Sequence, residues 1–253
     1  MYVWSVEEEL RGVYEWFLFA LIWTALWLLF YFERPLLRKR MLLASLFGAL
    51  IGLGEPFFVP RYWSPPSLFN LNVTTHFDVE SIIFFFASSG IAAIMYEAAL
   101  GDKYPSANSD ELGAKSRLHL YALGATPAVF LPLYFLTSLN PIYCISIAMS
   151  VGAVAAVACK PSLIKNAVLG GALFTGLNFF FFAFMSTAFP SFLSIWNMST
   201  LSKILVLGIP VETLMFGFTF GMAWSGVYLH VKRHIRFLTK PKPVDPDNAA
   251  APA

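Results

Sequence analysis

The decapeptide FDVESIIFFF at residues 77–86 returns in altered form as IPVETLMFGF at residues 209–218. In this alignment Glu80 matches Glu212, and one Val and two Phe are identical. Apolar matches are common in a chain of this composition, whereas a matched Glu inside an apolar stretch is not. Similar segments at a fixed offset indicate internal duplication. We therefore predict two copies of one structural unit.

The composition predicts that this unit lies in lipid. Of the 253 residues, 58% are hydrophobic, 17% are aromatic and only 13% are charged. A soluble domain of this length could not bury so much apolar surface. Helices satisfy their own backbone polar groups and are therefore the natural way to cross a bilayer. The predicted fold class is an all-α polytopic membrane protein.

Seven stretches have the length and apolar character of transmembrane helices. They comprise residues 13–32, 41–58, 78–100, 118–138, 142–159, 164–189 and 201–230. We predict two three-helix repeats joined by a connecting helix. The parts are an N-terminal segment (1–12), repeat 1 (13–100), a loop and connecting span (101–138), repeat 2 (139–235) and a disordered C-terminal tail (236–253).

Basic residues predict how the chain is oriented in the membrane. They cluster after the first, third, fifth and seventh stretches. With seven alternating helices, these four positions fall on one side. Connections rich in Lys and Arg stay in the cytoplasm. We therefore predict a multi-pass protein of the cell membrane, with its N-terminus outside and its C-terminus cytoplasmic.

The two matched glutamates, Glu80 and Glu212, are the candidate catalytic residues. A carboxyl in hydrocarbon costs several kcal/mol, so it usually serves a function. Glu212 is expected about 11 residues, or roughly 16 Å, inside a helix that begins near Leu201. Gly208 and Pro210 should loosen that helix just before it. Burial at this depth would keep the carboxyl protonated, as a general acid requires, and Glu80 should face it from the other repeat.

A structural interpretation remains open for the first of these glutamates. Asp78 and Glu80 could serve as the N-cap and the first-turn acid of the third helix. The same interpretation is weaker for Glu212, because the apolar run begins well upstream of it.

Other polar and aromatic residues near the helix ends have simpler explanations. Glu97 is expected to anchor its helix at the interface or to pair with Lys115 or Arg117. Aromatic residues such as Trp224 could pack or face lipid, and they would suit a carbocation if they lined a pocket.

Several motifs are absent from the sequence. It has no Gly-rich dinucleotide-binding turn, no P-loop, no His-rich iron box and no Asp-rich diphosphate motif. We therefore expect no cofactor, no metal and no nucleic acid partner. Carboxyl groups together with aromatic rings favour proton chemistry on an apolar substrate.

The stretch IPVETLMF at residues 209–216 resembles the lycopene cyclase domain signature, which reads apolar, Pro, apolar, Glu, Glu and then an apolar run. That domain is a three-span unit that is usually present twice, on two subunits or fused in one chain of seven spans. The layout here is similar over about residues 13–235. The stretch EPFFVPRYW at residues 55–63 also resembles uncharacterised bacterial proteins assigned to this domain.

The resemblance implies an isomerase of carotenoid biosynthesis that needs no flavin and acts on an apolar carotenoid or isoprenoid among membrane lipids. A carboxylic acid would protonate the ψ end of lycopene, the cation would close to a six-membered ring, and a base would remove a proton to leave a β-ionone end. Glu212 would be the acid or cation stabiliser, and Glu80 its counterpart. Substrate-binding roles would fall to Asp78, Ser81, Phe84, Pro210, Thr213, Phe216 and Trp224.

The chain departs from the signature at the second Glu, which is Thr213 in one copy and Ser81 in the other. The signature Pro is Asp78 in the first copy. If the second acid is needed, the chain would be a non-catalytic binder of carotenoid or isoprenoid lipid, or it would support a partner enzyme of the carotenoid pathway. A proton-coupled transporter could use the same two acids, but few polar residues are available to line its route.

Overall fold

The computed structural model describes residues 6–75, 77–101 and 116–239, and it is predominantly helical, as predicted. The long helices are α1 (Val6–Glu33), α2 (Arg38–Gly52), α4 (Val79–Leu100), α5 (Ser116–Leu136), α6 (Pro141–Cys159), α7 (Ile164–Ala188) and α8 (Val211–Thr239). The short elements are helix α3 (Leu71–Thr75), strands β1 (Leu205–Val206) and β2 (Ile209–Pro210), and the 3-10 turns η1 (Pro35–Leu37), η2 (Glu55–Phe57), η3 (Leu68–Asn70), η5 (Pro161–Leu163), η6 (Pro190–Ile195) and η7 (Met198–Thr200).

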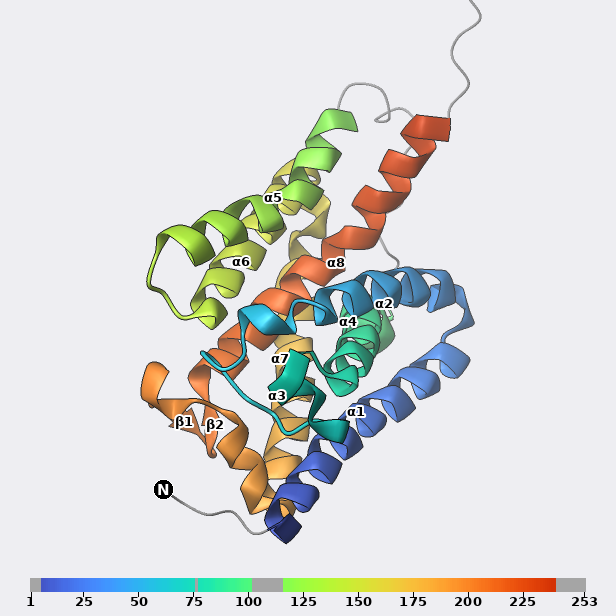
Figure 1. Ribbon diagram of the computed structural model, residues 1–253. Coiled ribbons are helices and arrows are strands. Elements are labelled where there is room, and N and C mark those ends of the chain that lie inside the picture. Colours follow the sequence, from blue (N-terminus) through green and yellow to red (C-terminus); the bar gives the residue numbers. More distant parts are fainter. Residues whose placement is uncertain (1–5, 76, 102–115, 240–253) are drawn as a thin grey trace, which may run out of the picture.

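Helices α4 and α8 form the centre of the bundle. Helix α4 packs against α1 and α2, helix α8 packs against α6 and α7, and the two central helices contact each other. In Figure 1, α8 runs through the middle of the molecule, with α1, α2 and α4 on one side of it and α5 and α6 on the other. The two matched glutamates therefore lie at the starts of two helices that each pack against several others.

Glycines allow these helices to approach closely. At Gly221, an added Cβ would lie 2.9 Å from the Cα of Gly171, so α8 and α7 touch backbone to backbone there. At Gly48, an added Cβ would overlap the Phe85 carbonyl oxygen, which belongs to α4. Small residues at contact points are typical of helix packing in lipid, where close van der Waals contact drives association.

Four helices in the described part of the chain are long and apolar enough to cross a membrane: Tyr14–Glu33, Val79–Leu100, Pro141–Cys159 and Pro161–Ala188. Large apolar side chains such as Leu29, Leu46, Val154 and Phe180 are exposed along α1, α2, α6 and α7. Carboxyl, guanidinium and amide groups lie inside the bundle instead. An apolar exterior of this extent around buried polar groups is characteristic of a membrane protein.

The start predicted for the seventh span is wrong. Residues 201–210 do not continue a helix, because β1 and β2 form an antiparallel hairpin there. Leu207 and Gly208 close the hairpin with φ angles of 49° and 84°, in the left-handed region. The hairpin carries apolar side chains, so hydropathy alone could not distinguish it from the beginning of a helix.

The second predicted span, residues 41–58 with an interruption at Gly54-Glu55-Pro56, is an α-helix only before that interruption. Helix α2 ends at Gly52 instead of continuing to residue 58, and the chain turns through η2. Pro56 explains the break, since proline removes a backbone donor and disfavours helical backbone in the residue before it. This break places Glu55 outside the helix.

The outer boundaries differ as well. Helix α1 begins at Val6, upstream of the predicted first span, and α8 continues to Thr239, beyond the predicted start of the tail at residue 236. The loop predicted after residue 101 and the remainder of the predicted tail lie outside the described residues.

Candidate functional site

Glu80 lies in the first turn of α4, directly after the helix N-cap. The N-cap residue is Asp78, whose carboxyl accepts hydrogen bonds from the backbone N–H and the hydroxyl of Ser81. This confirms the structural interpretation of Asp78 and of Glu80 as a first-turn acid. All three side chains are buried. Burial raises the pKa of the Asp78 carboxyl, and the two hydrogen bonds from Ser81 partly offset that rise.

The N-cap gives a prediction for stability. Asp78→Ala should lower the free energy of unfolding by about 1 kcal/mol, because it removes the capping acceptor from the start of α4. Asp78→Asn should not lower it, because Asn also caps helices and carries no charge to bury. Unfolding in a denaturing detergent would measure both variants. Equal losses in the two variants would contradict the capping role.

Glu212 occupies the same position in α8. The prediction that it lies deep inside a span is wrong, because α8 begins at Val211 and Glu212 belongs to its first turn. Its side chain is nevertheless only 1% exposed. The segment before the helix folds back over this end, so burial here comes from the preceding loop instead of from depth along a helix.

Each glutamate is bound by a backbone N–H of the loop that precedes its helix. Leu68 N–H donates to Glu80 Oε1 over 2.7 Å, and Ser202 N–H donates to Glu212 Oε1 over 2.7 Å. In both loops the next residue has left-handed backbone, with φ of 59° at Phe69 and 65° at Lys203. Hydropathy does not predict these two equivalent contacts. They make the two segments similar in structure as well as in sequence.

Glu212 has one donor more than Glu80. The hydroxyl of Tyr143, from α6, donates to the same Oε1 over 2.5 Å. The second carboxyl oxygen of each glutamate has no hydrogen-bond partner in the described part of the chain. Both glutamates are therefore fixed as hydrogen-bond acceptors, and each keeps one buried oxygen that is not used by the protein.

The two loops also bind each other. Trp63 and Trp196 form an isolated antiparallel bridge, with hydrogen bonds from Ser64 N–H to the Ile195 carbonyl (2.7 Å) and from Asn197 N–H to the Tyr62 carbonyl (2.9 Å). This bridge joins the loop before α4 to the loop before α8 at one end of the bundle. It holds the starts of the two central helices together.

A narrow cavity lies next to this bridge, between the two halves of the chain, and Trp63 of the bridge is part of its lining. Its lining is mostly aromatic and includes four polar side chains. It consists of Glu55, Phe58, Tyr62, Trp63, Phe84, Phe85, Ile142, Asn178, Phe182, Thr213 and Phe216. The first six come from the first half of the chain and the last five from the second half. The hollow is small, with a volume of about 30 Å³, and its lining is mostly apolar.

Some of the predicted site residues line this cavity, and others do not. Phe84, Thr213 and Phe216 line the cavity, and the Thr213 hydroxyl shares a 2.9 Å hydrogen bond with the hydroxyl of Tyr62. The remaining predicted residues are not among those that line it. They are Glu80 and Glu212, Asp78 and Ser81 at the start of α4, Pro210 in β2, and Trp224, which packs on Phe220 with ring centroids 5.9 Å apart.

The second half of the site carries the family resemblance. Residues 140–231, which cover α6, α7 and the start and middle of α8, match the family model described as lycopene cyclase. This segment is therefore similar to that family, and we refer to it as the lycopene cyclase domain. Neither a curated protein nor a solved structure matches the chain. The match lies within the predicted second repeat, and it connects the chain with carotenoid biosynthesis and a carotenoid substrate.

Outside the lycopene cyclase domain, sequence reasoning missed the acid among the cavity-lining residues, Glu55. It belongs to η2 and is 1% exposed. A carboxyl inside the short apolar stretch after residue 41 was the available signal. Asn178 of α7 and Tyr143 of α6 were also missed, because nothing in their local sequence indicates what they contact.

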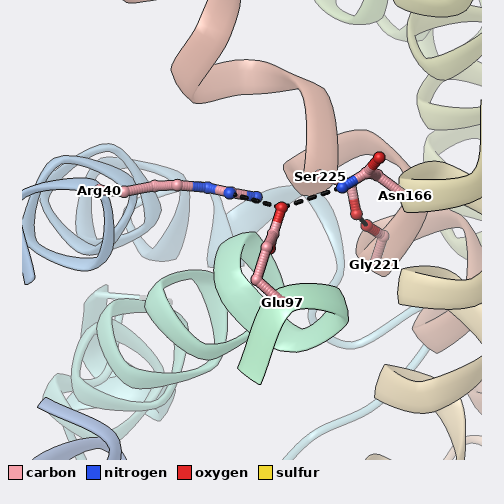
Figure 2. A network of polar contacts seen from close by, with 5 residues as sticks. All are labelled: Arg40, Glu97, Asn166, Gly221 and Ser225. Atoms are coloured by element: carbon pink, nitrogen blue, oxygen red, sulfur yellow. Dashed lines mark hydrogen bonds and ion pairs between the residues drawn. The ribbon is translucent and has the colours of Figure 1, made fainter. Parts of the chain in front are cut away.

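A second buried polar cluster joins the domain to the first half of the chain at the other end of the bundle (Figure 2). Arg40 of α2 forms an ion pair of 2.9 Å with Glu97 of α4, and Asn166 Nδ2 of α7 donates to the same Glu97 oxygen over 2.9 Å. Glu97 therefore pairs with Arg40, and the predicted partners Lys115 and Arg117 have side chains outside the described residues. This cluster is a structural contact between helices, well separated in sequence from the cavity residues.

Proposed function

We propose that this protein catalyses acid-driven, non-redox cyclisation of the ψ end group of a carotenoid to a β-ionone ring. The observation that carries the proposal is the aromatic cavity between the lycopene cyclase domain and the first half of the chain, which brings a carboxyl and two hydroxyl groups to a largely apolar hollow. Such a hollow matches a hydrocarbon end group in polarity, and its few polar groups match a reaction that moves only protons.

Aromatic walls suit the intermediate of this reaction. Cyclisation passes through a carbocation, and the faces of Phe84, Phe85, Phe182 and Phe216 can stabilise a cation by their quadrupoles. The mostly apolar lining also offers few groups that bind water, which would otherwise trap the cation before the ring closes. In the proposed binding mode, these rings and Thr213 contact the end group.

Glu80 and Glu212 are proposed to act as cation stabilisers. Each is buried, and a backbone N–H bound to one oxygen fixes the orientation of its carboxyl. In this proposal, the remaining predicted substrate-binding residues do not contact the substrate and instead hold other groups in position. Asp78 and Ser81 fix the start of α4, Pro210 fixes the start of α8, and Trp224 supports the aromatic stack.

The first half of the chain is proposed to be a second copy of the lycopene cyclase domain. Three features support this, beginning with the equivalent Glu contacts and the left-handed residue in each loop. The turns into α2 and α7 are also alike: Arg34-Pro35 opens η1, Lys160-Pro161 opens η5, and a helix follows each directly. Finally, α1, α2 and α4 pack together as α6, α7 and α8 do. Two such copies and the connecting α5 make seven membrane spans, with the N-terminus outside.

Pigment analysis in a lycopene-accumulating bacterial host tests the proposal. The wild-type chain should convert lycopene to monocyclic or bicyclic product, detected by chromatography of extracted pigments. Glu212→Gln should reduce the product on the order of a hundredfold, because the buried charge that is proposed to stabilise the cation is lost. Glu33→Gln is the matched control, since that carboxylate is exposed at the end of α1 and should leave the yield unchanged.

The departure of Thr213 and Ser81 from the family signature favours one alternative, a non-catalytic carotenoid or isoprenoid binder that supports a partner enzyme. Unchanged lycopene that co-purifies with the wild-type chain, and does so equally with Glu212→Gln, would establish that alternative and exclude the cyclase.

A further inference from the structure

Glu55 differs from the other buried glutamates in what surrounds it. Its side chain is 1% exposed and lines the aromatic cavity. Neither of its carboxyl oxygens has a hydrogen-bond partner in the described part of the chain, although the side chains of Ser81 and Trp63 lie near it. Glu80 and Glu212 are each bound by a backbone N–H. Glu55 is therefore a cavity-lining carboxyl that no backbone N–H of the described residues binds.

The surroundings of Glu55 favour the neutral acid. Burial raises the pKa of Glu55 well above its usual range, and the nearby carboxyl of Asp78 raises it further, while Ser81 and Trp63 lower it slightly. Tyr62 is the other titratable group around it, and burial raises the pKa of the Tyr62 hydroxyl as well. No basic side chain of the described residues faces this carboxyl, so no counter-ion is available to hold it ionised.

A second unused polar group faces the same hollow. The Oδ1 of Asn178, on α7, is buried and has no hydrogen-bond partner in the part of the chain that the structure describes. It comes from the lycopene cyclase domain, whereas Glu55 comes from the first half of the chain. A buried acceptor that the protein leaves unpaired is costly unless a ligand or solvent uses it. The cavity wall thus contains an acid and a neutral acceptor, and neither the Glu55 carboxyl oxygens nor Asn178 Oδ1 form a hydrogen bond within the described residues.

We propose that Glu55 is the proton donor of this cavity and that its carboxylate is also the base that ends the reaction. The proposal rests on the proposed cyclisation and names the acid that it requires. It assigns the proton transfer to a residue that the sequence comparison with Glu212 did not indicate.

The proposed steps balance without any other reactant. The proton of Glu55 adds to the CH carbon of the terminal double bond of the ψ end, using the electron pair of that double bond, and leaves a tertiary cation on the carbon that carries the two methyl groups. The electron pair of the nearby internal double bond then forms the ring C–C bond and moves the cation into the ring. Loss of a ring proton to the Glu55 carboxylate forms the new double bond and restores the acid. The product is an isomer of the substrate.

The role of Asn178 follows from the same geometry. An amide oxygen is a neutral acceptor that cannot remove a proton at neutral pH, but its partial negative charge stabilises a nearby cation. Asn178 is therefore assigned to the cation, beside Glu212 and Glu80, and not to the proton transfer.

Infrared spectroscopy tests the protonation of Glu55 independently of activity. In the purified chain in lipid vesicles at neutral pH, the carboxylic acid C=O stretching band should lose intensity on Glu55→Gln and keep it on Glu33→Gln. Gln has nearly the shape of a protonated Glu, and an unchanged elution profile in detergent would show that the variant folds. A band that does not change on Glu55→Gln would overturn the proposal, whatever the activity.

The activity of the same variants separates this proposal from the proposed function. Glu55→Gln should reduce cyclised product by at least a hundredfold in the lycopene-accumulating host while lycopene still co-purifies, and Glu55→Asp should restore part of the product. Wild-type yield from Glu55→Gln would exclude Glu55 as the donor and leave cyclisation standing. If the wild-type chain forms no cyclic product, the proposed function fails, and the donor role fails with it even if the infrared band identifies a protonated Glu55.

Discussion

Replacing Glu97 with alanine should cost the protein about 3–5 kcal/mol of unfolding free energy, because the guanidinium of Arg40 would stay buried without this counter-ion. Arg40 is 4% exposed, and the two groups lie 2.9 Å apart. The same carboxylate accepts the amide of Asn166. A single substitution at Glu97 therefore removes the contact that joins α4 to both α2 and α7, as Figure 2 shows.

The removal of both charges gives a sharper test than the single variant. Replacing a buried ion pair by apolar side chains of similar size is often nearly neutral, so Arg40→Met with Glu97→Met should recover most of the loss. Glu33→Ala, at an exposed carboxylate, should change stability by less than about 0.5 kcal/mol. Unfolding titrations in detergent would measure all three. Wild-type stability of Glu97→Ala, or a double variant no more stable than the single one, would contradict the role of the pair.

Local sequence predicted some elements well, and helix α4 is the clearest case. Its predicted range of 78–100 agrees with Val79–Leu100 because both ends have a physical cause in the sequence. Asp78 supplies the N-cap acceptor, and Gly101 supplies the left-handed residue, with φ of 69°, that ends the helix. The apolar run between them fixes the length.

The depth of Glu212 could not be predicted in the same way. Hydropathy measures how apolar a segment is and not whether it is helical, and the β1–β2 hairpin before Glu212 is as apolar as the helix that follows. Burial of this glutamate depends on a backbone donor at Ser202 and on a hydroxyl from Tyr143, which lies on another helix. Contacts between distant segments of this kind are not encoded in any local pattern.

The candidate site also contains both residues that the sequence indicated and residues that it did not. Phe84, Thr213 and Phe216, which sequence comparison predicted as substrate-binding residues, line the cavity, because they belong to the repeated segment at the starts of α4 and α8. It missed Glu55, because that residue reaches the cavity from η2 and has no match in the alignment of the two segments. The residue that stands at the second Glu of the family signature, Thr213, lines the cavity as well. At Thr213 the cavity wall has a hydroxyl where the family signature has a carboxyl. Glu55 provides a carboxyl to the same cavity.

The closest helix contact of the first half gives the last prediction. A Cβ at Gly48 would overlap the hydroxyl of Ser89, which can rotate away, and the carbonyl oxygen of Phe85, which is fixed in α4. Gly48→Ala should therefore separate α2 from α4 and cost about 1–3 kcal/mol, as overpacking does. Ring formation should fall with it, because Phe85 lines the cavity and Glu55 follows α2 directly.

Gly124→Ala is the control, since a Cβ there meets no atom within 4 Å, and it should gain up to about 1 kcal/mol from helix propensity. Unfolding titration and pigment analysis would measure both. A Gly48→Ala chain as stable and as active as Gly124→Ala would exclude the close approach of α2 and α4 and, with it, the position of Glu55 in the cavity wall.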